Sequence, residues 1–273
     1  MEKLKNILIP VDFSECAMNA IDYALGISQN QETEITLVHA YYVPFSFSET
    51  GTAVDGRTLE CLKNNAEEEM ENLKDRYKDF HSSMIFKCVA SFGIDAIKNE
   101  LEHKSYDLIV MGTKGASGLG ELFLGSITAN VIQEVEVPII CVPNKSKFTK
   151  IKNIAFACDY EDMYEPKEIN FLKQFAKMNE ATVHVVNVKE KTSSGHFNEA
   201  PYLESLFHDV PHTHSTSRFE NLEAGLNDFI TENDIDMLAM MPRKKNIFQK
   251  LFSESHTSKM AYHTKIPLLA VHE

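Results

Sequence analysis

The chain has 273 residues, of which 43% are hydrophobic and 25% are charged, and its formal net charge at pH 7 is −13. That length suffices for two domains of roughly 100 to 150 residues each. We expect no nucleic-acid or membrane partner, because an acidic chain repels polyanions except at a local basic patch. The five cysteines are odd in number, scattered and without C-x-x-C spacing. This pattern is typical of reduced thiols in a cytoplasmic protein, and the first residues lead straight into an apolar strand rather than a secretory signal peptide.

The first half alternates apolar runs of strand length with runs of helical periodicity. We expect strands at 7–11, 34–41, 85–90, 108–111 and 139–142, and helices that begin near 14 or span 59–77, 94–101 and 127–135. Residues 44–57 read as a loop. Strands that alternate with helices predict a parallel sheet covered by helices on both faces.

The stretch 107–142 runs from a buried strand through a glycine-rich loop into a helix and a second strand. Backbone N–H groups at a helix start can hold an anion, and glycine lets a ligand approach without a clashing side chain. We expect phosphate there, with Ser126 and Thr128 placed to donate their hydroxyl protons to it. On local sequence the alternative is a tight turn, with Ser126 as an ordinary helix N-cap.

The spacing Gly112, two residues, Gly115, nine residues, Gly125-Ser126 resembles the G-x2-G-x9-G-[ST] nucleotide loop of the universal stress protein family, in its ATP-binding branch. A P-loop and a dinucleotide fingerprint both have other spacings. The resemblance covers essentially the whole chain. It implies an α/β protein of two tandem Rossmann-like domains with the adenine nucleotide alpha hydrolase-like fold, each a five-stranded parallel sheet with helices on both faces. We expect a nucleotide-binding domain at 1–146 and a degenerate domain at 147–273.

The resemblance implies a site for ATP, AMP or ADP in the first domain. The contacts that it implies are Pro10, Val11, Asp12, Ala40, Met111, Gly112, Gly115, Gly125, Ser126, Ile127 and Thr128. Asp12 ends a strand at the edge where open α/β sheets bind ligands, although helix-start capping is an equally ordinary role for it. In the family the matching acid lies close to the ribose and the metal, which implies Mg2+ at Asp12. His39 ends the next strand, and we expect it to be a structural hydrogen-bonding residue.

The second half repeats the first. KNILIPVD at 5–12 reappears as KNIAFACD at 152–159, YDLIVM at 106–111 as IDMLAM at 235–240, and VPIICV at 137–142 as IPLLAV at 266–271. The second copy is shorter, and the shortening is expected in the loop and helix after its second strand. In the alignment Met241, Lys244 and Glu254 replace Gly112, Gly115 and Gly125. Side chains would then fill the path of a phosphate, and Glu254 would repel it, so we expect no ATP in the second half.

Two other features of the second half attract attention. The basic residues Arg243, Lys244, Lys245 and Lys250 form a local cluster that either grips an anionic ligand or partner, or is a solvated loop. His212 and His214 would point to one side of a strand, as a metal pair does, yet no third ligand lies nearby in sequence.

We expect an ATP-binding stress-response regulator with little or no hydrolysis. In the first half only Asp12, Lys114 and helix-terminal amides stand out as groups for phosphoryl transfer, with no evident general base. The alternatives are an adenine-nucleotide hydrolase, at most a slow ATPase, or a nucleotide-free interaction scaffold. Family members commonly pair through their last strands, so the resemblance implies an intramolecular pseudo-dimer through 139–142 and 268–271, and a homodimer stays open.

Overall fold

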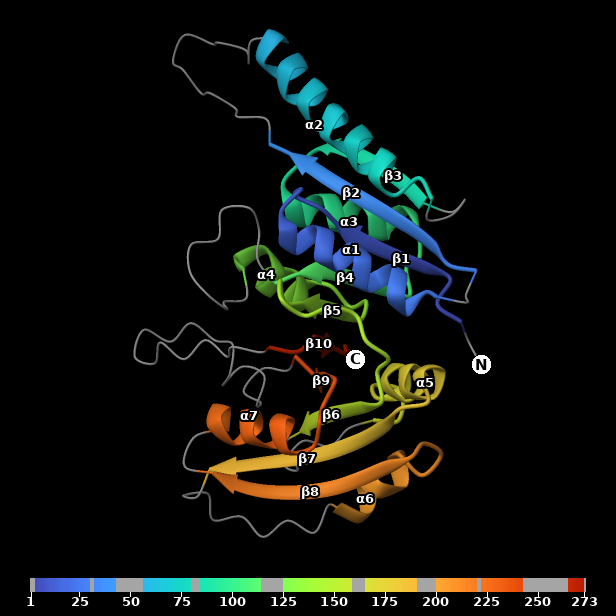
Figure 1. Cartoon of the computed structure of the whole chain (residues 1–273), viewed down its shortest axis with the longest axis vertical. Helices are drawn as coiled ribbons and strands as arrows, with labels where there is room; N and C mark the ends of the chain where they lie inside the picture. Colours follow the sequence, from blue (N-terminus) through green and yellow to red (C-terminus); the bar gives the residue numbers. More distant parts are fainter. Residues whose placement is uncertain are drawn as a thin grey trace.

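The computed structural model describes residues 3–29, 32–42, 56–79, 84–113, 125–158, 165–190, 200–219, 222–242 and 265–272. The strands are β1 (Asn6–Pro10), β2 (Glu34–Tyr41), β3 (Met84–Ala90), β4 (Leu108–Gly112), β5 (Ile139–Val142), β6 (Asn153–Cys158), β7 (Thr182–Glu190), β8 (His212–Phe219), β9 (Met237–Met240) and β10 (Leu268–Ala270). The helices are α1 (Glu15–Ile27), α2 (Gly56–Arg76), α3 (Gly93–His103), α4 (Ser126–Glu134), α5 (Asn170–Asn179), α6 (Ala200–Leu206) and α7 (Leu222–Glu232). Strands and helices alternate in both halves, as predicted (Figure 1).

One sheet of ten strands runs through both halves, in the order β3-β2-β1-β4-β5-β10-β9-β6-β7-β8. The five strands of each half are mutually parallel. The junction pairs β5 with β10 in antiparallel register, with Cys141 opposite Leu268 and Ile139 opposite Ala270. The α/β class, the two tandem domains and the five-stranded parallel sheets are therefore confirmed.

The strands are apolar runs because helices cover both faces of the sheet. One core contains side chains from α1, α2, α5 and α6, for example Ile21, Met70 and Phe175. The opposite core contains side chains from α3, α4 and α7, such as Ile97 and Val131. Both cores include residues from the two halves, so the hydrophobic interior is continuous across the junction.

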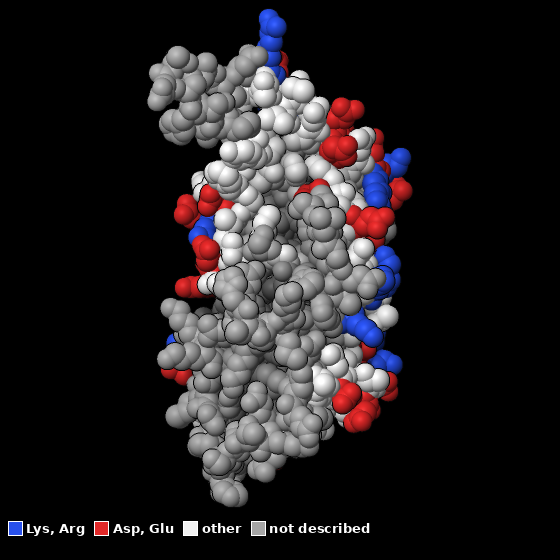
Figure 2. Space-filling model, turned by 90° about the vertical axis from the view of Figure 1, so that its left-hand side faces the viewer, with Lys and Arg blue, Asp and Glu red and all other residues white. Residues whose placement is uncertain are grey.

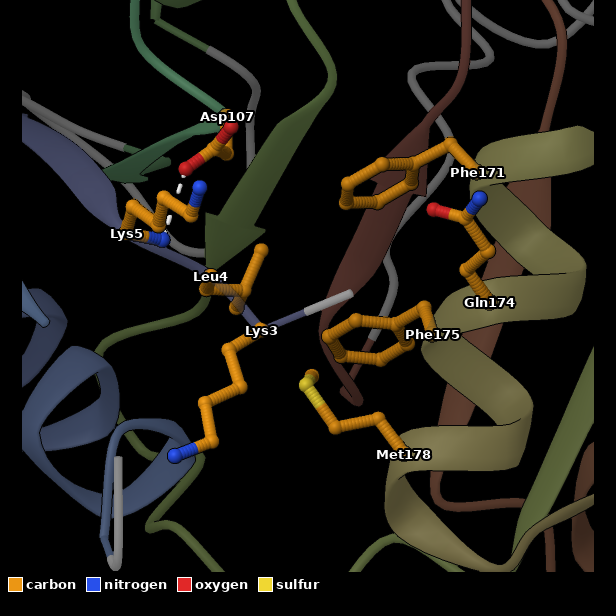
Figure 3. A pocket seen from close by; sticks show the side chains of 8 residues that line it. All are labelled: Lys3, Leu4, Lys5, Asp107, Phe171, Gln174, Phe175 and Met178. Carbon is orange, nitrogen blue, oxygen red and sulfur yellow. Dashed lines mark hydrogen bonds between the residues drawn. The ribbon is translucent and has the colours of Figure 1, made fainter. Parts of the chain in front are cut away.

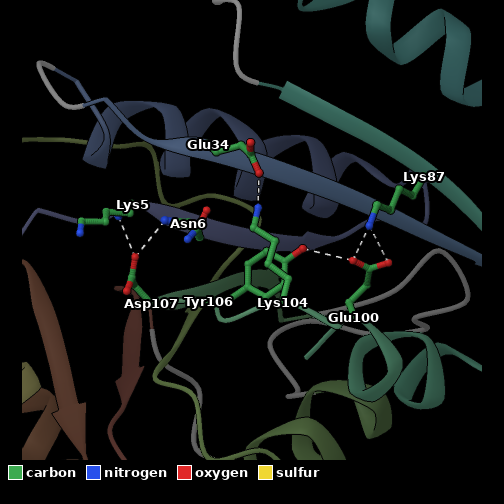
Figure 4. A network of polar contacts seen from close by, with 8 residues as sticks. All are labelled: Lys5, Asn6, Glu34, Lys87, Glu100, Lys104, Tyr106 and Asp107. Atoms are coloured by element: carbon green, nitrogen blue, oxygen red, sulfur yellow. Dashed lines mark hydrogen bonds and ion pairs between the residues drawn. The ribbon is translucent and has the colours of Figure 1, made fainter. Parts of the chain in front are cut away.

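The internal repeat extends to individual hydrogen bonds at the amino ends of the strands. The Asp107 carboxylate accepts the backbone N–H groups of Lys5 and Asn6, at 2.7 and 2.9 Å (Figure 4). Its counterpart Asp236 accepts those of Lys152 and Asn153 at the same two distances. Each carboxylate thus satisfies two donors where the first strand of its half begins.

The second copy is shortened in the predicted place. Helix α2 has 21 residues, whereas α6, at the same position in the repeat, has 7. The acidic residues Glu67, Glu68, Glu69 and Glu71 of α2 are exposed, while Met70 between them is buried, so this acidic run is a solvated helix face. The predicted loop at 44–57 lies almost entirely outside the described residues.

The segment that connects the two halves is fixed on α1. The Asn19 side-chain amide donates to the carbonyl oxygens of Pro143 and Ser146, at 2.9 and 2.7 Å. The Phe148 ring lies directly on Gly26, where an added Cβ would stand 2.3 Å from the ring. Only glycine therefore fits at this position of α1.

Packing at the junction is looser beside α5. A cavity of about 260 Å³ separates Lys3 and Leu4, before β1, from Phe171, Phe175 and Met178 on α5 (Figure 3). It lies at the amino end of the sheet, opposite the edge where parallel α/β sheets bind ligands. We read this cavity as a packing gap between the halves.

The last residues of the described chain return to the first half. The His272 Nε2–H donates to the carbonyl oxygen of Ile132 in α4, at 2.7 Å. That carbonyl lies in the last turn of α4, where no backbone N–H of the same helix reaches it. A side chain from the second half thus helps to terminate a helix of the first.

No helix in the described part of the chain is both long and apolar enough to cross a membrane. The five cysteines form no disulfide in the described structure; Cys16, Cys141 and Cys158 are buried, Cys88 is half-buried and Cys61 is exposed. The expectation of reduced thiols agrees with this arrangement.

Burial lowers the pKa of His184, His214 and His272 below their ordinary 6.5. The unfolded chain then binds more protons than the folded chain once the pH falls through about 6.5, so stability is full above that pH and decreases below it. We predict a lower free energy of unfolding in urea at pH about 5.5 than at about 7.5. His272→Gln should reduce this difference, because it removes one of the three groups. Equal stability at both pH values would contradict the prediction.

Candidate functional site

The candidate site lies at the carboxyl ends of β1, β2 and β4. Strand β1 is central in the first half, with β2 on one side and β4 on the other, so the chain leaves it in opposite directions. Open α/β sheets bind ligands at such a switch point. Figure 2 views the molecule from this edge and shows the charged side chains of described residues mainly along the flanks.

The turn from β1 into α1 is held by its own side chains. The Ser14 hydroxyl and backbone N–H both donate to Asp12 Oδ1, at 2.6 and 3.1 Å. Ser14 in turn is the N-cap of α1 and accepts the N–H of Ala17. The capping alternative for Asp12 therefore holds in part, since Asp12 orients the residue that caps the helix. Phe13 between them has φ of 61°, a strained left-handed conformation that the surrounding contacts maintain.

His39 has the structural role predicted for it. Its Nδ1–H donates to the carbonyl oxygen of Val11 at 2.8 Å, and its ring lies 4.3 Å from the Phe13 ring, centroid to centroid. The Val11 N–H also donates a hydrogen bond, to the carbonyl oxygen of Val38 at 2.9 Å. Val11 thus fixes the end of β1, whereas Pro10 and Ala40, at the ends of β1 and β2, are only partly buried.

The end of β4 packs against the first turn of α1. A Cβ on Gly112 would lie 2.8 Å from Cys16 Sγ and 3.0 Å from the Cys16 backbone carbonyl. Gly112 is therefore required for close contact between strand and helix, a role that the loop motif did not predict. Met111 is 5% exposed and sits in the core, so only its backbone reaches the edge.

Helix α4 begins beside this strand end. Gly125 is the N-cap, with φ of −60°, and its N–H donates to the Thr113 carbonyl oxygen at 2.6 Å. Ser126 is thus the first helical residue, and the alternative in which it caps the helix is wrong. The hydroxyl of Thr128, which is 3% exposed, donates to the Gly112 carbonyl oxygen at 3.1 Å. Its single proton is used inside the protein, contrary to the expected donation to phosphate, and Thr128 instead ties α4 to β4.

Parts of the predicted site lie outside the described residues. They are Gly115, Lys114, the side chain of Ser126, the basic cluster from Arg243 to Lys250, and Glu254. The other predicted contacts are described, and they lie at one edge of the sheet. They are Pro10, Val11, Asp12, Ala40, Met111, Gly112, Gly125, Ile127 and Thr128.

The same edge differs in the second half. Met241, the counterpart of Gly112, is 2% exposed and part of the core. Helix α5 starts at Asn170, later in the repeat than α1 does, so no described helical turn packs where Cys16 packs against Gly112. Met241 therefore fills core space in the second half, whereas Gly112 makes room for the first turn of α1 in the first half.

His212 and His214 lie on β8 with their ring centroids 5.3 Å apart. The His212 Nδ1–H donates to the Val210 carbonyl oxygen at 2.9 Å. Within the described ranges, no three His, Cys, Asp or Glu side chains are grouped as a metal ion would require. The structure thus adds no third ligand to this histidine pair.

Two aromatic residues at this edge were not expected from the sequence. Tyr42 follows β2 and Phe92 precedes α3, and their ring centroids lie 5.1 Å apart. Their exposed fractions are 53% and 57%. Sequence patterns predict such residues poorly, because in a short connecting segment an exposed aromatic residue cannot be distinguished from a core residue.

The contact between Gly112 and Cys16 yields a prediction. We expect Gly112→Ala to lower the free energy of unfolding by about 1 to 3 kcal/mol, because the added methyl group meets helix backbone that cannot move aside easily. Gly93→Ala is the matched control: its Cβ would lie 3.4 Å from Ile127, an ordinary contact, and should leave stability unchanged or slightly higher. Equal unfolding midpoints of the two variants in urea would refute the packing role of Gly112.

Comparisons with known proteins agree with this architecture. The model of the Universal stress protein family matches residues 3–143 and again 150–272. Universal stress protein MJ0577 of Methanocaldococcus jannaschii is 29% identical over 157 residues, which cover 52% of this chain and 96% of that protein. Universal stress protein MJ0531 of the same organism is 29% identical over 146 residues, or 52% of this chain and 84% of that protein.

Among solved structures, a universal stress protein from Archaeoglobus fulgidus DSM 4304 aligns over 98% of both chains with a TM-score of 0.70 and 14% identity, which supports the fold alone. Because the family model matches both halves, the chain belongs to the universal stress protein family and carries two tandem copies of its domain.

Proposed function

We propose that the first domain binds ATP or a related adenine nucleotide and that the protein is a nucleotide-responsive regulator of the stress response. The observation that carries this proposal is the start of α4, where a glycine N-cap stands beside the glycine end of β4 at the switch point of the sheet. Free N–H groups in a first helical turn and the helix dipole attract a phosphate. The G-x2-G-x9-G-S spacing and membership of the family support the same reading.

The proposed contacts differ in kind. Met111 and Gly112 would offer backbone atoms, because the side chain of Met111 is buried and Gly112 has none. Gly125, Ser126 and Ile127 would offer the backbone of the first helical turn. Thr128 would act indirectly, since its bond to Gly112 sets the distance between α4 and β4. Pro10, Val11, Ala40 and Gly115 complete the proposed set.

Asp12 is the carboxylate that we propose for Mg2+. Magnesium commonly binds through one or two carboxylates together with substrate phosphates, so a single acid beside a triphosphate is sufficient. Asp12 Oδ1 is held by Ser14, which fixes the carboxylate at the ligand edge. The ion, when bound, would neutralise phosphate charge.

We propose little or no hydrolysis. Phosphoryl transfer needs a positioned nucleophile and positive groups around the developing charge, besides a metal. At the described part of this edge, the side chains that could act as a general base are Asp12, which orients Ser14, and His39, whose Nδ1–H is committed to the Val11 carbonyl oxygen. A binding protein fits this arrangement better than an enzyme.

We also propose that the two domains form a pseudo-dimer, with boundaries near 146 and 147, in which the second supplies the strand partner but no equivalent nucleotide site. The β5–β10 pairing supports the first part, and the buried Met241 supports the second. Cysteines that are not joined in disulfides favour a cytoplasmic location.

Nucleotide content tests the proposal. We expect protein purified or incubated with Mg-ATP to release about one adenine nucleotide per chain on denaturation, measured by ion exchange of the supernatant. Gly125→Trp should abolish retention while the protein stays folded, because a φ of −60° accepts any side chain without backbone strain. Glu254→Trp, at the aligned position of the second half, is the control and should retain nucleotide. A nucleotide-free wild-type protein, or two nucleotides per chain, would count against the proposal.

Turnover is tested separately. We expect single-turnover mixtures of protein and radiolabelled Mg-ATP to release phosphate no faster than about one per hour, far below typical kinase rates of about 1 to 100 per second. Asp12→Asn should not change that background rate. Rapid hydrolysis that Asp12→Asn abolishes would establish the hydrolase alternative instead.

A further inference from the structure

Exposed apolar side chains gather beside the candidate nucleotide site. Among the described residues, the large hydrophobic side chains that are most exposed are Phe92 at 57%, Tyr42 at 53%, Ile127 at 51% and Tyr202 at 38%. The first three meet at one place. The Tyr42 and Phe92 rings lie with their centroids 5.1 Å apart and their planes tilted by 41°. Ile127 lies beside Gly93, the residue after Phe92, since a Cβ added to Gly93 would stand 3.4 Å from the Ile127 side chain. We call Tyr42, Phe92 and Ile127 the aromatic shelf.

The shelf extends along the carboxyl edge of the sheet. Tyr42 follows β2, Phe92 lies between β3 and α3, and Ile127 is the second residue of α4. Ile127 belongs to the proposed nucleotide site, and Ala40 lies two residues before Tyr42 on the same strand. The shelf is thus continuous with the site at both ends.

The stability of helix α3 does not explain why its N-cap is a phenylalanine. It is the N-cap of α3, with φ of −78° and ψ of 151°, and no side-chain hydrogen bond caps the helix there. Ser, Thr, Asp or Asn at this position would satisfy a free N–H of the first turn. The chain instead places a phenyl ring more than half exposed at a position that favours a small polar residue. The phenyl ring of Phe92 contacts the ring of Tyr42, itself an exposed residue. A residue that breaks a local rule for so small a gain in packing points to a function.

We propose that the aromatic shelf is a stacking platform for the base of the bound nucleotide and gives this site a preference for purines over pyrimidines. This inference depends on the proposed nucleotide function. A heteroaromatic base stacks on aromatic side chains through its flat face, and such contacts are sequence-tolerant but grow with ring area. The two rings of a purine cover more of the shelf than the one ring of a pyrimidine.

Size argues against a protein partner as the occupant. A stable protein interface needs about 20 to 30 residues on each side, whereas the shelf offers three side chains. A second copy of this chain is therefore an outcome of the test rather than part of the proposal.

The test compares Phe92→Ser with wild-type protein in calorimetric titrations of ATP, CTP and inorganic tripolyphosphate. We expect ATP to bind the variant about tenfold more weakly, which corresponds to about 1.4 kcal/mol, while CTP changes less and tripolyphosphate stays within about twofold. The thermal midpoint should be equal or higher, because serine supplies the missing helix cap. A purely structural role for Phe92 would give the opposite result, a lower midpoint with unchanged ATP affinity.

Three further variants complete the design. Tyr42→Ala should weaken ATP binding as Phe92→Ser does. Phe92→Tyr should retain the wild-type affinity for ATP, because it keeps an aromatic ring. Tyr202→Ala, which removes an exposed aromatic side chain of the second half, should leave every affinity unchanged.

Unchanged ATP affinity in Phe92→Ser, or equal losses for ATP and tripolyphosphate, would overturn the inference while the nucleotide function stands. Self-association of wild type that Phe92→Ser abolishes, without loss of ATP affinity, would overturn it in favour of a second copy. If the wild-type protein binds tripolyphosphate as tightly as ATP, the base contributes nothing to affinity and the stacking platform is refuted. If the wild-type protein binds neither compound, the proposed nucleotide function itself is refuted.

Discussion

The antiparallel pairing of β5 with β10 is the contact on which the rest of the structure depends. A strand at the edge of a sheet leaves unpaired backbone groups that invite aggregation. Every described residue of β5 and β10 is buried, and both strands are short and apolar. Each would be an exposed hydrophobic edge without the other. The pairing therefore turns two domains with unprotected edges into one sheet whose outer strands, β3 and β8, are more polar and less buried.

The two ends of the strands have been preserved to different degrees in the repeat. At the amino end, Asp107 and Asp236 make the same pair of backbone hydrogen bonds in both halves. At the carboxyl end, Gly112 in one half faces Cys16, while its counterpart Met241 is a buried core residue. The two halves thus share the interactions that hold the amino ends of their strands, and they differ at the carboxyl edge. This contrast is expected if only the first domain needs space for a ligand.

The sequence predicted the fold well because strands buried on both faces are apolar along their whole length, and because the repeat doubled each signal. The position of the candidate site was predicted from the rule that ligands bind at the carboxyl ends of parallel strands, and it stays a prediction. Individual roles were harder. Glycine permits either a ligand or another backbone to come close, and the contact of Gly112 with Cys16 joins residues far apart in sequence. The acceptor of Thr128 depends equally on tertiary packing. The exposed ring of Phe92, at the N-cap of α3, was not predicted either, because its exposure depends on how α3 meets the end of β3.

Helix α4 connects the second domain to the proposed ligand site. A short helix has free N–H groups at its start and free carbonyl groups at its end, and both ends need partners. In α4 the start is left to Gly125 and, in our proposal, to phosphate, while His272 of the second half donates to Ile132 near the end. Thr128 and the Gly125 N–H fix the first turn to β4 and Thr113. A nucleotide that binds at the start of α4 therefore meets a helix already anchored at both ends. In our proposal the second domain has no nucleotide site of its own, yet its His272 contributes to the geometry of α4 in the first domain. This contact is a physical reason for both copies to remain in one chain.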